Sequence, residues 1–137
     1  MCGISGIFNW NKKEEISRNI LDNMLEKIKH RGPDGKDMYV DDCVGLGFNR
    51  LSFLDLNGGM QPITNEDNYK ELRAGLIKNG HKFRTETDIE TIIHLYEEEG
   101  IECVKKLNGQ FAIALYDKNK KTLMLVRDHV GICPLFY

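Results

Sequence analysis

Residues 1–10 of the chain read MCGISGIFNW. Every second position of this stretch holds one of the residues Ile4, Gly6, Phe8 and Trp10, and mostly polar or small residues stand between them. Alternation with a period of two is typical of a half-buried β-strand. A strand is therefore predicted at the start of the chain, with Cys2 at its beginning.

The next segment carries apolar residues at helical spacing. From Glu14 to Lys29 the apolar positions recur every fourth residue at Ile16, Ile20, Met24 and Ile28, and the stripe is widened by Leu21 and Leu25. This pattern predicts an amphipathic helix. The helix should stop at the sequence HRGPDG of residues 30–35, whose glycine and proline content is typical of a loop.

Two further helices are predicted in the second half of the chain. Residues 69–79 show helical spacing, and Gly80 follows as a left-handed cap. Thr87 and Glu90 match a capping box, which predicts the start of the other helix. Its expected buried stripe consists of Ile89, Ile92, Ile93 and Tyr96, and Gly100 should end it.

Strand patterns also recur after the first helix. Val44, Leu46 and Phe48 alternate, and the apolar run then continues to Leu54, as two strands or as one strand bent near Arg50. Residues 111–115 and 122–126 form a predicted hairpin around a turn at 117–121. Because turns join most strands and the helices fall into two blocks, we expect an antiparallel α+β fold and not βαβ units.

Composition limits the kinds of partner. A chain of 137 residues with 41% hydrophobic residues fits one globular domain, 1–137. The 19 basic and 21 acidic residues nearly cancel, so neither nucleic acid nor an anionic membrane is an expected partner. Apolar runs are far shorter than the roughly 20 residues of a membrane-spanning helix, and no basic leader is present. A small neutral or zwitterionic ligand fits better.

Cysteine and histidine positions argue against a metal site. The four cysteines form no C-x-x-C pair, and the four histidines show no zinc-ligand spacing. We therefore expect no metal, no disulfide framework and a reducing, cytoplasmic location. The histidines are His30, His81, His94 and His129.

Cys2 carries the most informative chemistry. Removal of Met1 would leave a free α-amine beside the thiol, and these groups titrate near ~7.7 to 8.0 and ~8.5. The amine can then accept the thiol's proton, directly or through water. The alternative is that Met1 is retained and Cys2 is a small, inert apolar residue.

Four segments together resemble class II glutamine amidotransferases, most closely the N-terminal domain of glutamine-hydrolysing asparagine synthetases. They are MCGISG at 1–6, HRGPD at 30–34, RLS at 50–52 and RDHVGICPL at 127–135. The resemblance implies the N-terminal-nucleophile hydrolase fold, a four-layer αββα sandwich of two antiparallel sheets between helix layers. This agrees with the α+β arrangement expected from the strand and helix patterns.

The resemblance also implies a role for each site residue. Cys2 would attack the side-chain amide of glutamine and form a glutamyl thioester. Arg50 would bind the substrate α-carboxylate through its guanidinium fork, and Asp88 would bind the α-ammonium. Backbone groups of the following residues would line the pocket: Leu51, Ser52, Phe53 and Leu54.

Each of these roles has a simpler competitor. Arg50 also fits a surface arginine paired with Asp55, and Asp88 also fits a first-turn acid favoured by the helix dipole. His30 and His129 are interpreted as structural, because a nucleophile with its own amine needs no further base. Arg127 and Asp128 are expected to make a folding contact.

One departure from the family concerns the oxyanion hole. Family members carry an Asn-Gly pair between the Q-P segment and the K-E-L-R helix, but here residues 61–68, QPITNEDN, run directly into that helix. Two explanations stay open: a true deletion, or a stretch omitted from the sequence. Loss of one oxyanion donor costs roughly 100-fold to 1000-fold in rate.

The sequence thus predicts a glutaminase domain that supplies ammonia to a synthetase domain or subunit outside these 137 residues. In the resembled enzymes that part uses ATP and Mg²⁺ to amidate aspartate, so we expect no cofactor in this domain. The alternatives are a non-catalytic docking or regulatory domain and an amidotransferase for another acceptor. A homodimer is left open.

Overall fold

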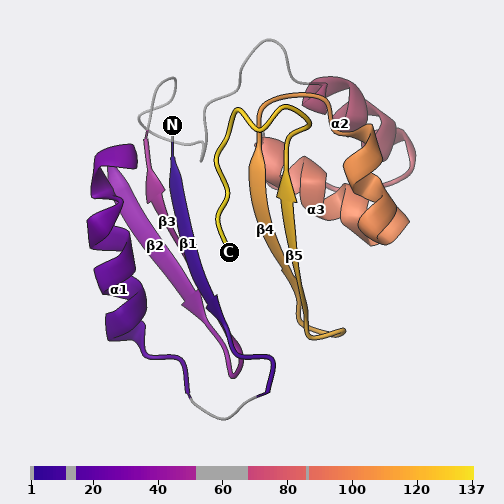
Figure 1. Cartoon of the computed structure of the whole chain (residues 1–137). Helices are drawn as coiled ribbons and strands as arrows, with labels where there is room; N and C mark the ends of the chain where they lie inside the picture. The colour runs from indigo at the N-terminus through magenta and orange to yellow at the C-terminus, as the bar shows by residue number, and fades with distance from the viewer. Residues whose placement is uncertain (1, 12–14, 52–67, 86) are drawn as a thin grey trace. The chain divides into compact units, whose positions relative to one another are not determined.

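The computed structural model describes residues 2–11, 15–51, 68–85 and 87–137, whose helices and strands are labelled in Figure 1. The chain divides into two compact units. The first consists of Met1–Leu54 and Ala114–Met124, and the second of Asp55–Ile113 and Leu125–Tyr137. In the part of the chain that the structure describes, no helix is long and apolar enough to cross a membrane.

The first unit contains an antiparallel sheet with the strand order β1-β3-β2. The strands are β1 (Gly3–Phe8), β2 (Gly35–Val40) and β3 (Val44–Arg50). Gly3 lies opposite Asn49, and Gly35 lies opposite Arg50, so the start of β1 and the start of β2 flank the end of β3. The predicted strands at the N-terminus and at Val44 are confirmed.

Strand β2 is absent from the sequence-based prediction. It pairs only with β3 and is mostly exposed. A strand with so little buried surface shows no apolar alternation, which is the signal used to predict strands.

Helix α1 (Arg18–Lys27) packs against this sheet and contacts β1, β2 and β3 (Figure 1). Its buried residues are Leu21 and Leu25, and a side chain at Gly47 of β3 would lie only 2.8 Å from Leu25. The predicted helix is confirmed, but it begins at Arg18. Placing Ile20 in the buried stripe was wrong, because its side chain is 55% exposed while Leu21 and Leu25 face the sheet.

The second unit is built around helices α2 (Tyr69–Lys78) and α3 (Asp88–Glu99), followed by the 3₁₀ segment η2 (Gly100–Lys106). Both predicted helices are confirmed, and Gly100 is the C-cap of α3. The buried residues of this core are Leu76, Leu95, Cys103 and Leu107. Burial raises the pKa of the Cys103 thiol, which fits a structural and unreactive cysteine.

The predicted buried stripe of α3 is partly wrong. Ile89 and Ile93 are 41% and 46% exposed, whereas Thr91 and Leu95 are buried. Ile92 is partly buried and packs against the core as predicted. Apolar residues occupy more than one face of α3, so periodicity alone does not select the face that packs against α2.

The last two strands, β4 (Ala112–Asp117) and β5 (Thr122–Arg127), form the predicted hairpin. The Asp117 carboxylate accepts hydrogen bonds from the backbone N–H groups of Asn119 (2.9 Å) and Lys120 (2.9 Å). Asp at the start of a turn is favoured because it bonds the backbone in this way. The hairpin tip belongs to the first unit and its base to the second. The described chain is thus α+β with two antiparallel sheets.

Candidate functional site

Cys2 lies directly before β1, and its sulfur is held by the backbone that follows β3. The Leu51 N–H donates to Cys2 Sγ at 3.2 Å, and the thiol lies 3.7 Å from the Leu51 carbonyl oxygen. The pairing of Gly3 with Asn49 brings these two chain segments together. Cys2 is partly exposed. An N–H aimed at sulfur stabilises negative charge that develops there.

Arg50, the last residue of β3, is fixed from its other side by β2. Gly35 pairs with Arg50 in the sheet, and the Arg50 carbonyl accepts a hydrogen bond from the Asp34 N–H at 3.0 Å. The structure therefore brings the predicted residues Cys2, Arg50 and Leu51 together at one end of the first sheet. The competing ion pair with Asp55 lies outside the described residues.

The HRGPDG segment is held against the end of β3. Its first residues form the 3₁₀ segment η1 (Lys29–Arg31), and the chain then packs on the backbone of Asn49 and Arg50. A Cβ at Gly32 would lie 2.3 Å from the Asn49 carbonyl oxygen, which no side chain tolerates. Gly32 thus permits the close approach that supports Arg50.

Asp88 lies in the second unit, as the first residue of α3. Its carboxylate accepts a hydrogen bond from the Ile89 N–H at 2.9 Å, which is the first-turn position expected of a helix acid. It also lines a hollow of about 50 Å³ with residues that include Asn68, Tyr69 and Asn108. Cys2 belongs to the first unit and Asp88 to the second.

Arg127 and Asp128 make the predicted folding contact. The buried Asp128 carboxylate accepts hydrogen bonds from the N–H groups of Ile132 (2.9 Å) and Cys133 (3.0 Å), which lower its pKa below the usual range. Arg127 donates to the Gly131 carbonyl oxygen at 2.7 Å. Both side chains therefore close the turn after β5.

Comparison with known proteins identifies the family. The sequence profile of the glutamine amidotransferase domain matches residues 1–137. The chain belongs to this family. The resemblance inferred from the four sequence segments is confirmed.

Relatives of the amidotransferase domain are asparagine synthetases. Glutamine-hydrolyzing asparagine synthetase 2 of Bacillus subtilis (strain 168) is 46% identical, over 100% of this chain and 20% of the relative. Asparagine synthetase 1 of the same strain is 36% identical over 100% of the chain and 24% of the relative. Asparagine synthetase 2 of Oryza sativa subsp. japonica is 38% identical over 99% of the chain and 25% of the relative. The chain therefore spans a quarter or less of the length of these relatives.

The amidotransferase domain is shorter than the matched stretch of its relatives. The alignment with the first Bacillus relative is 151 positions long, which is 14 more than the 137 residues of the chain. The predicted site residues Ser52, Phe53 and Leu54, and the segment where the Asn-Gly pair is missing up to Asp67, lie outside the described residues. Those predictions stay predictions.

Sequence reasoning about the amidotransferase domain missed Asn49. Its side chain is 1% exposed and donates to the Leu25 carbonyl oxygen at 2.7 Å, at the C-terminal end of α1. Asn49 thereby ties α1 to β3 one residue before Arg50. The sequence signal for Asn49 was a polar residue that follows a run of apolar and small residues within β3.

A hollow in the first unit lies away from the candidate site. It has a volume of about 250 Å³ and lies at the Phe8 end of β1, away from Cys2. The cysteine that lines this hollow is the buried Cys43 and not Cys2, so we base the assignment on the geometry of Cys2, Arg50 and Leu51.

Proposed function

We propose that this chain is a glutaminase domain that hydrolyses glutamine to glutamate and ammonia, with Cys2 as the nucleophile. One observation carries the proposal: the Cys2 sulfur accepts the Leu51 N–H at 3.2 Å beside Arg50. The family and the names of the relatives support the same reaction. The ammonia would pass to a synthetase domain or subunit that uses ATP and Mg²⁺ to amidate aspartate.

The reaction proceeds in two steps. After removal of Met1, the α-amine of Cys2 takes the thiol proton, and Sγ bonds to the carboxamide carbon of glutamine. The C–N bond then breaks, and the nitrogen leaves as ammonia with the transferred proton. Water cleaves the resulting glutamyl thioester to give glutamate and the free thiol. The Leu51 N–H stabilises the thiolate before attack.

Two charged groups would select a free amino acid. Arg50 binds the substrate α-carboxylate, because a guanidinium presents two parallel N–H donors to the two oxygens. Asp88 binds the α-ammonium from the start of α3. For Asp88 to act in this way, the two units must pack as the four-layer αββα sandwich of N-terminal-nucleophile hydrolases, which we include in the proposal.

The cellular setting follows from the cysteines. All four are free, and Cys43, Cys103 and Cys133 are buried. Free thiols in this number fit a reducing compartment, so we propose a cytoplasmic location.

The experiment compares ammonia release from glutamine by the full-length protein and by its Cys2→Ala variant. We expect Cys2→Ala to lose about a thousandfold or more of the activity, because no other group can form the thioester. A glutamine-mimicking electrophile should label Cys2, and the three buried cysteines serve as internal controls in peptide mass mapping. Unchanged ammonia release in Cys2→Ala would end the proposal.

A second candidate is a non-catalytic docking or regulatory domain of the same fold. It is favoured by the 14 aligned positions for which the chain has no residue, together with the missing Asn-Gly pair. Intact-mass measurement separates the two candidates. Retained Met1 and an unlabelled Cys2 would support the docking domain, whereas loss of Met1 and labelling at Cys2 would support the glutaminase.

A further inference from the structure

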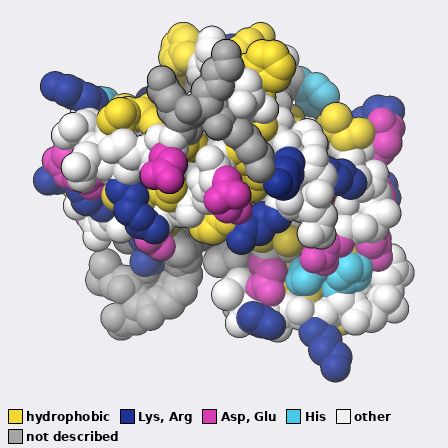
Figure 2. Space-filling model, turned by 90° about the horizontal axis from the view of Figure 1, so that it is seen from below, with side chains coloured by type: hydrophobic (Ala, Val, Ile, Leu, Met, Phe, Trp, Pro, Cys, Tyr) yellow, Lys and Arg dark blue, Asp and Glu magenta, His cyan; other side chains and the backbone are white. Residues whose placement is uncertain are grey.

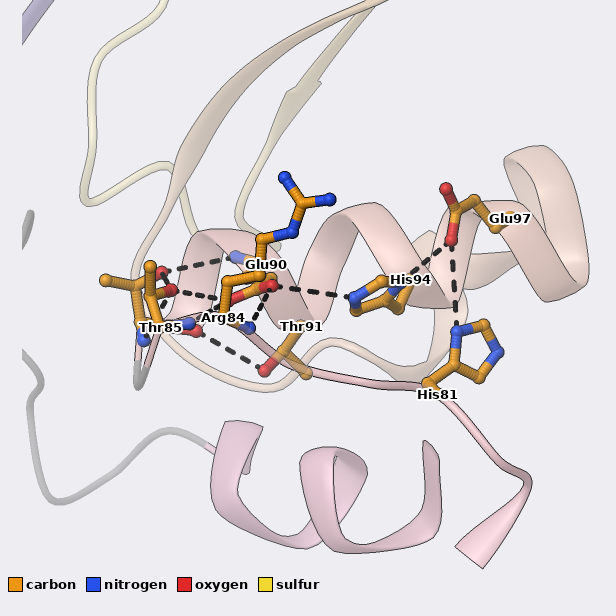
Figure 3. Close-up of polar contacts among 8 residues, drawn as sticks. His81, Arg84, Thr85, Glu90, Thr91, His94 and Glu97 are labelled. Carbon is orange, nitrogen blue, oxygen red and sulfur yellow. Dashed lines mark hydrogen bonds and ion pairs between the residues drawn. The ribbon is translucent and has the colours of Figure 1, made fainter. Parts of the chain in front are cut away.

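Two histidines that are distant in sequence meet beside α3. His94 and Glu97 lie on α3, and His81 follows α2; Figure 3 shows the three side chains pointing toward one another. The Oε2 atom of Glu97 lies 2.8 Å from Nδ1 of His94 and 3.9 Å from Nδ1 of His81. One ligand atom from each residue falls within 4.8 Å of the others. We call these three residues the histidine cluster.

A helix-ending motif sets the position of His81. The Gly80 N–H bonds to the Ile77 carbonyl at 3.0 Å, and the His81 N–H bonds to the Leu76 carbonyl at 3.0 Å. This pair of bonds is the Schellman motif, and it requires the left-handed conformation found at Gly80, with φ +98°. On α3 the spacing of three residues places His94 and Glu97 on one face. The cluster is thus held at two ordered elements.

Each histidine directs its other ring nitrogen toward a further carboxylate. Nε2 of His81 lies 3.1 Å from Glu98, and Nε2 of His94 lies 3.7 Å from Glu90 (Figure 3 shows the second contact). Metal-binding histidines commonly have an outer carboxylate that accepts a hydrogen bond and orients the ring, and Glu98 lies at this distance from His81, whereas Glu90 is too far from His94 for a hydrogen bond. The arrangement therefore leaves both Nδ1 atoms facing Glu97.

The outer carboxylates are themselves fixed. Glu98 accepts a hydrogen bond from the Asn79 side chain at 3.0 Å. Glu90 accepts the backbone N–H groups of Arg84 and Thr85 at 2.7 Å each. The Thr85 hydroxyl also donates a hydrogen bond to Glu90. The predicted capping box is only half formed, because Thr87 accepts the Glu90 N–H but Glu90 reaches Arg84 and Thr85.

The surroundings favour a cation between the rings. The imidazole centroids of His81 and His94 are 4.8 Å apart. Three carboxylates lie around the pair, and the Phe83 ring packs edge-on against His94 at 4.7 Å. Histidine and acidic side chains also meet on the face drawn in Figure 2. A divalent ion can accept a nitrogen ligand from each ring and an oxygen ligand from the Glu97 carboxylate.

We propose that His81, His94 and Glu97 bind one divalent transition-metal ion of the zinc type, through Nδ1 of each histidine and a carboxylate oxygen of Glu97. Zinc binds such atoms at about 2.0–2.1 Å, which places tetrahedral ligands roughly 3.4 Å from one another. The measured 2.8 and 3.9 Å lie on either side of this value. The Glu97 side chain is 56% exposed and free to adjust, and water completes the coordination.

The bound ion ties the loop after α2 to α3. Its ligands come from both sides of the α2–α3 connection, so binding closes that connection as a cross-link does. The two imidazoles and the carboxylate form a set that suits zinc, cobalt and nickel better than magnesium or calcium, which prefer oxygen ligands.

The test uses the full-length protein with Cys2→Ala, because a terminal amine and thiol would chelate the same metals. Co²⁺ is titrated by its visible absorption, and Zn²⁺ by calorimetry. We expect saturable binding of one ion to the parent. The affinity for this ion should fall at least about tenfold in His81→Gln, in His94→Gln and in Glu97→Gln. Glu98→Gln, which removes an outer carboxylate, should lower the affinity about 10- to 100-fold.

His30→Gln and His129→Gln are the matched controls, since both histidines are exposed and lie outside the cluster. Their affinity should equal that of the parent. Binding that is as tight in His81→Gln and Glu97→Gln as in the parent would overturn the proposal, as would an absence of saturable binding to the parent. These two variants suffice if His94→Gln fails to fold.

Discussion

Backbone groups hold the Cys2 sulfur in the first unit, whereas side chains hold the histidine ring nitrogens in the second unit. Cys2 Sγ is met by the Leu51 N–H, and the neighbouring Arg50 is fixed through its carbonyl by the Asp34 N–H. In the histidine cluster the ring nitrogens are met by carboxylates of Glu97 and Glu98. A site held by the backbone depends on how closely two chain segments approach, while a site held by side chains depends on the identity of each residue.

This difference teaches which substitutions matter at each place. At the Cys2 site, the sensitive positions beyond Cys2 and Arg50 are those where added atoms would push two backbones apart. At the histidine cluster, even an isosteric change that removes one carboxylate charge should lower the affinity for the metal ion. The following predictions test the comparison, beginning with the largest expected effect.

Gly32→Ala should damage the first unit most. Its Cβ would lie 2.3 Å from the Asn49 carbonyl oxygen, and neither backbone can move without disturbing the end of β3. We expect the free energy of unfolding to fall by about 3 kcal/mol or more, with loss of glutamine hydrolysis. Denaturant unfolding and ammonia release measure the two effects.

Gly75→Ala is the matched control for this substitution. Gly75 lies within α2, and nothing is within 4 Å of the position of its Cβ. This variant should gain about 0.5–1 kcal/mol, because alanine has the higher helix propensity. Equal stability of Gly32→Ala and the parent would show that close backbone approach does not hold the site.

Arg50→Lys tests the side chain at the backbone-held site. Lysine keeps the charge but loses the two-pronged geometry, so we expect the KM for glutamine to rise about 10- to 100-fold while kcat changes little. Steady-state kinetics of the full-length protein provide the measurement, with the exposed Arg18→Lys as control. A large fall in kcat at constant KM would contradict the assignment of Arg50 to substrate binding.

Gly80→Ala should have the smaller of the two destabilising effects. No atom lies within 4 Å of the added Cβ, so the cost comes only from φ +98° and should be about 1–2 kcal/mol. Because His81 follows directly, metal affinity should fall as well. Gly80→Asn should cost less, since asparagine adopts left-handed conformations more readily. Identical melting temperatures of Gly80→Ala and the parent would contradict the argument.

Much of the fold was predictable because its elements carry local signals. Alternation identified β1, β3 and the hairpin, and helical spacing identified α1, α2 and α3. Besides β2, which shows no apolar alternation, the periodicity missed which face of each helix is buried. Leu21 is buried while Ile20 is exposed, because the direction in which α1 meets the sheet is set by β3 and not by the helix sequence alone.

The site was predictable only through resemblance. No spacing rule places Arg50 and Leu51 next to Cys2, since antiparallel pairing over 49 positions of sequence creates that contact. Asn49 was missed because its partner, the Leu25 carbonyl, is identified only by the packing of α1. The histidine cluster was missed for the same reason. His81 and His94 become neighbours only when the chain turns back after Gly80.

The hairpin of β4 and β5 has a consequence for dissecting the molecule. Because its tip belongs to the first unit and its base to the second, neither unit is a continuous stretch of chain. No single truncation can yield either one intact, and during ribosomal synthesis the first unit stays unfinished until Met124 has emerged. Fragments cut between the units should therefore be insoluble or unfolded.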